Sequence, residues 1–222
     1  MTAGPAHVRS VNVGKGVVRP YASGPVTAID KRPVDSIEVR DPGPKRGGLG
    51  SGVIADEVGD TRHHGGTNQA VYAYAREDLD WWAARLGRDL ADGRFGENLT
   101  TVGIDCTHAR VGEIWHIGEV TLRVEGPRIP CATFAGHMGE RGWVKRFTEA
   151  GRTGAYLSVV APGVLSAGDA VSIERPGHEI DLLLTFRAFM GDLDAARLVL
   201  AAGVLNDVDH RGLAEDVERR AG

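Results

Sequence analysis

The chain has 222 residues, of which 42% are hydrophobic and 25% are charged, as in an ordinary globular protein with one large domain or one domain and a small second one. Its net charge of −4 provides no broad basic surface for nucleic acid, and no run of about 18 apolar residues indicates a membrane span. The N-terminal segment lacks the apolar stretch of a signal peptide, so we expect a cytoplasmic protein without nucleic-acid or membrane partners.

The first two-thirds of the chain consists mostly of predicted short strands. Runs rich in β-branched residues and broken by Gly, Pro and Asp occupy residues 7–19, 26–34, 35–43, 154–163 and 168–177. Residues 112–127 predict a hairpin whose turn lies at Gly118 and Glu119. Short strands separated by turns are typical of a small barrel or sandwich.

Two helices are predicted within this part. The longer covers residues 67–87, because apolar side chains at steps of three and four form one stripe, which consists of Val71, Ala75, Leu79, Trp82 and Leu86. We expect Thr67 or Asn68 to cap its start and Gly87 to end it. The shorter helix covers residues 142–151 and ends at Gly151.

The composition changes after Gly177. The segment that follows has no strand signals and predicts three short helices, with Asp192 as an N-cap and Gly203 just after a helix C-terminus. We therefore expect a β-rich domain at residues 1–177 and a three-helix C-terminal domain at residues 178–222.

Two cysteines, Cys106 and Cys131, are too few for a disulfide framework or an iron–sulfur cluster. We expect Cys131 to be free, although a bridge between the two stays open. Cys131 is either a thiolate nucleophile or soft-metal ligand, favoured by the charge of Arg128 nearby, or a small buried hydrophobe. The residues alone favour the hydrophobe, and Cys106 is interpreted as structural.

The sequence His63-His64-Gly65-Gly66 precedes the longer predicted helix. Glycines allow close approach of the backbone to a ligand, so this loop is a candidate anion site. The alternative is a capped loop with His63 exposed and His64 hydrogen-bonded. Adjacent histidines on an extended chain point in opposite directions, so both are not expected to bind one metal ion. The glycine-rich residues 47–52 match no nucleotide-binding fingerprint.

Several motifs in order along the chain carry a family resemblance: HHGG with AVYAY and DWW, then GRFGENLTT, then PRIPC, then GW, RF and GRTGAYLSVV, then GDAV. Over roughly residues 8–175 they resemble the MOSC family, named for the C-terminal domain of molybdenum cofactor sulfurase, and within it the stand-alone bacterial YiiM-like members. The resemblance implies an α+β fold, with a β-barrel-like MOSC domain followed by the small three-helix domain.

The resemblance also implies a function. It implies that the chain binds a molybdenum–pterin cofactor (molybdopterin), that Cys131 is the catalytic residue and ligates the molybdenum, and that N-hydroxylated compounds such as 6-N-hydroxylaminopurine are reduced and so detoxified. No pyridoxal phosphate is expected. Residues that can hold the cofactor's phosphate and pterin by charge, backbone N–H groups or an amide are Lys15, His64, Gly65, Gly66, Asn98 and Arg128. The stretch before Asp56 departs from the family's usual GL-x-GD pattern, which bears on the pocket wall and on substrate choice.

The chain carries no flavin or dinucleotide motif, so a reductase of this kind requires a separate electron-donor protein. The tail either docks this donor or only packs on the β-rich domain, and a homodimer stays open. One alternative function is a carrier of molybdenum cofactor or of a persulfide on Cys131. A further alternative is a hydrolase in which Cys131 is the nucleophile and His108, His116 or His137 the base.

Overall fold

A computed structural model describes residues 5–221. Its main sheet has eight strands in the order β10-β6-β7-β8-β4-β5-β1-β2, and a second sheet pairs β3 with β9. The strands are β1 His7–Val13, β2 Arg32–Val34, β3 Ser36–Val39, β4 Val71–Ala75, β5 Leu99–Val102, β6 Ile114–Ile117, β7 Val120–Pro127, β8 Ala155–Ala161, β9 Gly163–Ser166 and β10 Ser172–Glu174. The fold is α+β, as predicted. The sheet is barrel-like only in a loose sense, because β10 and β2 are unjoined edges.

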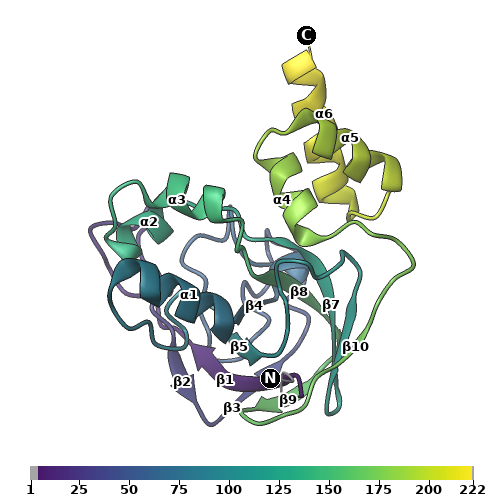
Figure 1. The fold of residues 1–222 in the computed structure, drawn as a ribbon. Helices are drawn as coiled ribbons and strands as arrows, with labels where there is room; N and C mark the ends of the chain where they lie inside the picture. Colours follow the sequence, from purple (N-terminus) through teal and green to yellow (C-terminus); the bar gives the residue numbers. More distant parts are fainter. Residues whose placement is uncertain (1–4, 222) are drawn as a thin grey trace.

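The helices lie on two sides of this sheet (Figure 1). Helices α1–α3 lie together near β4 and β5, whereas α4–α6 project from the molecule beyond β7 and β8. The described helices are the short 3-10 helix η1 Thr67–Gln69 and the α-helices α1 Arg76–Leu86, α2 Ala132–Met138, α3 Trp143–Ala150, α4 Leu182–Phe189, α5 Leu193–Ala202 and α6 Asp207–Ala221. None of the described helices is long and apolar enough to cross a bilayer.

The predicted helix over residues 67–87 is wrong in its first half. Residues 71–75 form the inner strand β4, which pairs with β5 in parallel and with β8 antiparallel, and all five of its residues are buried. A strand buried on both faces has no apolar–polar alternation, so Val71 and Ala75 fitted a helical stripe by coincidence. The helix begins only at Arg76, and Gly87 ends it in the left-handed conformation, as predicted.

Other predicted elements are confirmed. The hairpin β6–β7 turns at Gly118 and Glu119, and α3 ends at Gly151. The tail forms three helices, Asp192 caps α5 through hydrogen bonds from the N–H groups of Asp194 and Ala195, and Gly203 follows its C-terminus. Helix α2 was missed because it has only seven residues, too few for a periodic signal.

Two apolar clusters hold the fold together. One is aromatic and packs α1, α2 and α3 against the sheet through Tyr72, Tyr74, Trp82, Phe95, Phe134, Trp143 and Phe147. The other joins sheet residues such as Trp115 and Leu122 to tail residues such as Leu182 and Val199. The tail therefore shares a core with the sheet, and the domain boundary near residue 177 stays a prediction.

Candidate functional site

Segments far apart in the sequence meet around a cleft that encloses about 780 Å³ of empty space, part of it open to solvent. Cys131, at the N-terminus of α2, is half-buried in its wall, and Arg128 lies close by in the sequence after β7. Both cysteines are free, and Cys106 is fully buried with a raised pKa caused by burial, as its structural interpretation requires. The other polar lining residues include Ser51, Asp56, His64, Gln69, Tyr72, Asn98, Thr133 and Tyr156 together with Lys31.

Arg128 is a buried cation without a carboxylate partner in the described part of the chain. Arg128 is only 6% exposed, and its guanidinium lies 4.1 Å from the ring centre of Phe134 and 5.1 Å from that of Tyr72. One of its N–H groups donates to the carbonyl of Phe95, and no ion pair reaches it from residues 5–221. A buried charge is costly to leave unpaired, so this part of the cleft favours an anionic ligand.

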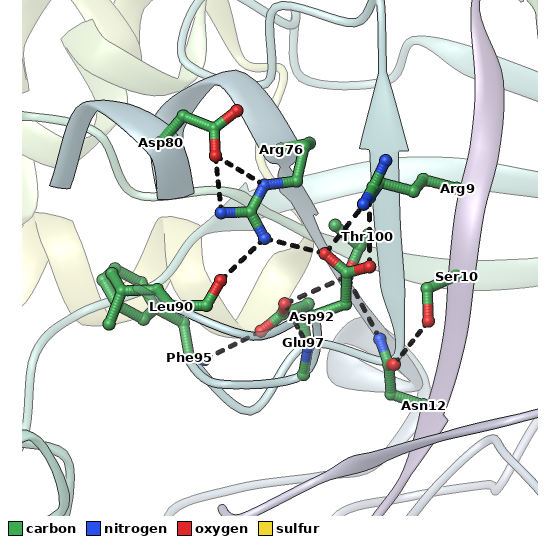
Figure 2. A network of polar contacts seen from close by, with 11 residues as sticks. Arg9, Ser10, Asn12, Arg76, Asp80, Leu90, Asp92, Phe95, Glu97 and Thr100 are labelled. Carbon is green, nitrogen blue, oxygen red and sulfur yellow. Dashed lines mark hydrogen bonds and ion pairs between the residues drawn. The ribbon is translucent and has the colours of Figure 1, made fainter. Parts of the chain in front are cut away.

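Glu97 fixes the loop that carries Phe95 (Figure 2). The carbonyl of Phe95 accepts the hydrogen bond from Arg128. The carboxylate of Glu97 is fully buried and accepts hydrogen bonds from the N–H of Gly93 at 2.6 Å, the N–H of Phe95 at 2.9 Å and the hydroxyl of Thr100 at 3.0 Å. Burial raises the pKa of Glu97 to about 7, although these hydrogen bonds favour the charged form. Glu97 therefore acts on the site through the loop geometry.

The same loop is anchored at its start by an arginine network (Figure 2). The carboxylate of Asp92 accepts from Arg76 at 2.8 Å and from Arg9 at 3.0 Å, and Arg76 also donates to the carbonyl of Leu90 at 2.8 Å. These contacts tie β1 and α1 to the connection that leads into β5. The cleft wall thus rests on three separate segments of the fold.

A second buried cation, Lys31, also lines the cleft but is paired with Asp56. Their side chains are 8% and 2% exposed, and Asp56 also accepts from the N–H of Gly14 at 2.7 Å, the hydroxyl of Ser51 at 2.8 Å and the amide of Asn98 at 3.1 Å. Burial lowers the pKa of Lys31, and the attraction of Asp56 opposes this shift. No local sequence pattern indicates this pair, because its two members come together only in the folded chain.

The structure brings most of the predicted site residues together. His64, Gly65, Asn98, Arg128 and Cys131 line the cleft. The amide of Asn98 is used within the protein, since it accepts from the N–H of Tyr72 at 3.2 Å and donates to the carbonyl of Asn12 at 3.2 Å as well as to Asp56. It therefore braces the cleft wall in this structure.

Two predicted residues lie outside the lining. The side chain of Lys15 is 65% exposed and its ammonium group lies 3.6 Å from the carboxylate of Glu57. Gly66 is buried behind the wall, where its N–H donates to the carbonyl of Gly50 at 2.9 Å. A Cβ at Gly66 would lie 2.6 Å from the backbone nitrogen of Lys45, so this glycine allows two loops to pack closely.

The side chains of the two adjacent histidines lie in different surroundings. His63 is exposed and its ring lies 2.8 Å from Asp60, whereas His64 turns into the cleft. Burial and the charge of Arg128 lower the pKa of His64 to about 4, so its ring is neutral at pH 7. Its ring makes no hydrogen bond with residues 5–221, so the capped-loop alternative is right for the exposed His63 and wrong for a hydrogen-bonded His64.

The histidines considered as hydrolytic bases do not reach the cleft. His108 pairs with Asp105 on the surface, and His116 is exposed near Glu174. His137 is buried, and its ring lies 3.1 Å from the carbonyl of Arg94. None of the three lines the cleft with Cys131, which gives no support to the hydrolase alternative.

Comparison with known proteins assigns the family. The MOSC domain model matches residues 60–172, which include the HHGG loop, the Glu97 loop, Arg128 and Cys131. The chain belongs to the MOSC domain family. It is 30% identical over 173 residues to "Uncharacterized protein YflK" of Bacillus subtilis (strain 168), covering 78% of this chain and 75% of YflK. It is also 30% identical over 160 residues to "Protein YiiM" of Escherichia coli (strain K12), covering 71% of this chain and 68% of YiiM.

Two solved structures share the fold over nearly the whole chain. The crystal structure of YiiM from Geobacillus stearothermophilus matches with a TM-score of 0.74 at 23% identity, over 96% of this chain and 100% of that one. YiiM from Escherichia coli matches with a TM-score of 0.70 at 22% identity, over 99% and 94% of the two chains. A fungal protein named "Reductase", from Gibberella moniliformis, is 34% identical over 131 residues, which cover 57% of this chain and 23% of that protein.

The residue before Asp56 has an unusual backbone conformation. Ala55 has a φ of 69°, and it is the one non-glycine residue with positive φ in the described part of the chain. This conformation is costly for a residue with a Cβ. The loop that carries Asp56 into the cleft is therefore locally strained.

Proposed function

We propose that this chain is a molybdenum-cofactor-dependent reductase of N-hydroxylated compounds, such as 6-N-hydroxylaminopurine, with an external electron donor. The observation that carries the proposal is the pairing of a half-buried thiol, Cys131, with a buried and unpaired cation, Arg128, in one cleft of a MOSC domain. A thiolate suits a soft metal, and a guanidinium suits a phosphate.

The residues present fit a metal that arrives within an organic cofactor. Among residues 5–221, no group of three His, Cys, Asp or Glu side chains is placed to hold a metal ion. An ion at Cys131 would therefore take most of its ligands from a non-protein group, such as the sulfurs of a pterin. Arg128 would hold the phosphate of that group by a bidentate contact, for which its buried charge has no competing partner in the described chain.

The bound cofactor would supply the two-electron redox chemistry, and the protein would position it. Cys131 would ligate the metal, and the Glu97 loop would keep the guanidinium of Arg128 in place through the Phe95 carbonyl. The Lys31–Asp56 pair and Asn98 would keep the opposite wall rigid. The name of the fungal relative supports a reductase, although the similarity covers only 23% of that protein.

Turnover with a chemical reductant tests the proposal. Protein purified with its molybdenum is supplied with 6-N-hydroxylaminopurine and a reduced viologen, and formation of the amine is followed by chromatography. We expect amine formation that requires both the reductant and bound molybdenum. A molybdenum-loaded protein that leaves the substrate unchanged, together with a mass increase of one sulfur atom on Cys131, would instead support the persulfide carrier.

A further inference from the structure

One tyrosine connects the cleft to a second hollow of the molecule. Tyr156, on β8, lines both the Cys131 cleft and a groove between the sheet and the tail that encloses about 1060 Å³ of space and opens to solvent. The groove lies beside α6 and the segment that leads from β7 to Arg128. Its other lining residues include Gln69, Pro127, Ile129, Phe189, Val208 and Leu213.

The hydroxyl of Tyr156 makes no hydrogen bond within the described residues, in contrast to the side chains of Tyr72 and Lys31 in the same cleft. Tyr72, whose ring packs 4.9 Å from that of Tyr156, donates its hydroxyl to the carbonyl of Thr153 at 2.7 Å. Lys31 is held by Asp56, and the ring of His64 is neutral at pH 7, which makes it a very weak acid. No hydrogen bond of the Tyr156 hydroxyl is formed within residues 5–221, so this O–H is free for a ligand.

The proposed reaction consumes protons inside the cleft. Each N-hydroxylated substrate accepts two electrons from the external reductant and two protons, the N–O bond breaks, and the amine and one water molecule leave. Oxygen leaves as water only if it is protonated, so a donor must stand next to the N–OH group. Burial raises the pKa of Tyr156, which keeps its phenol protonated at neutral pH.

We propose that Tyr156 donates one of these two protons to the departing oxygen and regains it from water in the groove, while the second proton comes from solvent and ends on the amine nitrogen. This inference rests on the proposed function. The tyrosinate left after the transfer lies in the field of the buried Arg128 guanidinium, which favours its negative charge. Because Tyr156 also lines the groove, we expect water in the groove to reach the phenol without passing through the substrate.

The variant Tyr156→Phe removes the O–H and keeps the ring that packs on Tyr72. The matched control is Tyr74→Phe, because the hydroxyl of Tyr74 is bonded to the carbonyl of Arg152 and to Trp82 away from the cleft. Molybdenum content and unfolding temperature are measured first. Binding of 6-N-hydroxylaminopurine to the loaded protein is then measured by calorimetry without reductant, and turnover is measured with reduced viologen.

We expect Tyr156→Phe to keep its molybdenum and its unfolding temperature. Its dissociation constant should rise about 2- to 10-fold for the lost hydrogen bond, and its turnover rate should fall about 100-fold or more for the lost acid. Tyr74→Phe should lose stability and keep both binding and turnover. Equal turnover in wild type and Tyr156→Phe would overturn the inference and leave the proposed function standing, whereas no binding and no turnover by loaded wild type would remove both.

A second variant keeps the test decisive if Tyr156→Phe loses its cofactor. Replacing Tyr156 by 3-fluorotyrosine keeps the shape of the side chain and makes the phenol more acidic. The alkaline fall of the pH–rate profile, where the donor is deprotonated, should then move to lower pH. The ring of Tyr72 packs on this phenol, and the charge of Arg128 favours its deprotonated form. An unchanged profile in the fluorinated protein would overturn the inference.

Discussion

At the scale of single residues, the anion preference of the cleft rests on Arg128. We expect Arg128→Ala to lose cofactor more readily than Arg128→Lys, because lysine keeps the charge and loses only the bidentate geometry. The charged hydrogen bonds are worth about 1.5–3 kcal/mol, or roughly one to two powers of ten in affinity. Molybdenum and pterin content after gel filtration checks this, with the exposed Arg141→Ala as control. Equal retention by all three variants would make Arg128 a purely structural residue.

Ala55 offers a prediction about stability alone. Its positive φ of 69° costs about 1–2 kcal/mol, whereas glycine adopts this conformation freely but gives the unfolded chain more entropy. Ala55→Gly should therefore raise the free energy of unfolding by up to about 1 kcal/mol. Ala84→Gly, at an exposed position inside α1, should lower it by about 0.5–1 kcal/mol. Urea unfolding measures the free energy of unfolding of both variants against wild type. A loss of stability in Ala55→Gly would contradict the assigned strain.

At the scale of elements, the Glu97 loop should make stability depend on pH. The pKa of Glu97 is about 7 in the folded chain and near 4.5 in the unfolded chain, so its stabilising contribution is complete below pH 4.5 and is lost as the pH rises through 7. The raised pKa corresponds to about 3 kcal/mol. The variant Glu97→Gln has no carboxyl group at this position and therefore lacks this pH-dependent contribution to the free energy of unfolding. The difference in unfolding free energy, wild type minus Glu97→Gln, should thus fall by about that amount between pH 5 and pH 8, and a constant difference would contradict it.

The elements also show where sequence reasoning succeeds. The hairpin and the three tail helices were predicted because turn glycines, an aspartate cap and local periodicity determine them within a few residues. Strand β4 was not predicted, because its continuous burial depends on neighbours from distant parts of the chain. Within the cleft, Cys131 and Arg128 followed from the family resemblance. The sequence did not identify three further residues of the cleft, Lys31, Asp56 and Tyr156, since only the folded chain places them together.

At the scale of the whole molecule, the tail is part of the core. The N–H groups of Leu182 and Leu183 donate to the carbonyls of Ala109 and Thr107, and Leu182 is fully buried in the apolar cluster of the sheet. We expect removal of residues 178–222 to lower the unfolding temperature and to slow turnover with protein and chemical donors alike. Thermal unfolding and both assays check this. A truncated chain of full stability that is slow only with a protein donor would instead assign the tail to donor docking.

The central claim is that Cys131 ligates the molybdenum of a cofactor held in this cleft. Elemental analysis tests it most directly, on wild type, Cys131→Ser and Cys106→Ser purified from a host that makes the cofactor. Serine is a poor substitute for a thiolate on a soft metal, and Cys106 is buried away from the cleft. We predict molybdenum in wild type and Cys106→Ser and its loss from most of the Cys131→Ser protein. Equal molybdenum in all three proteins, or none in wild type, would contradict the account.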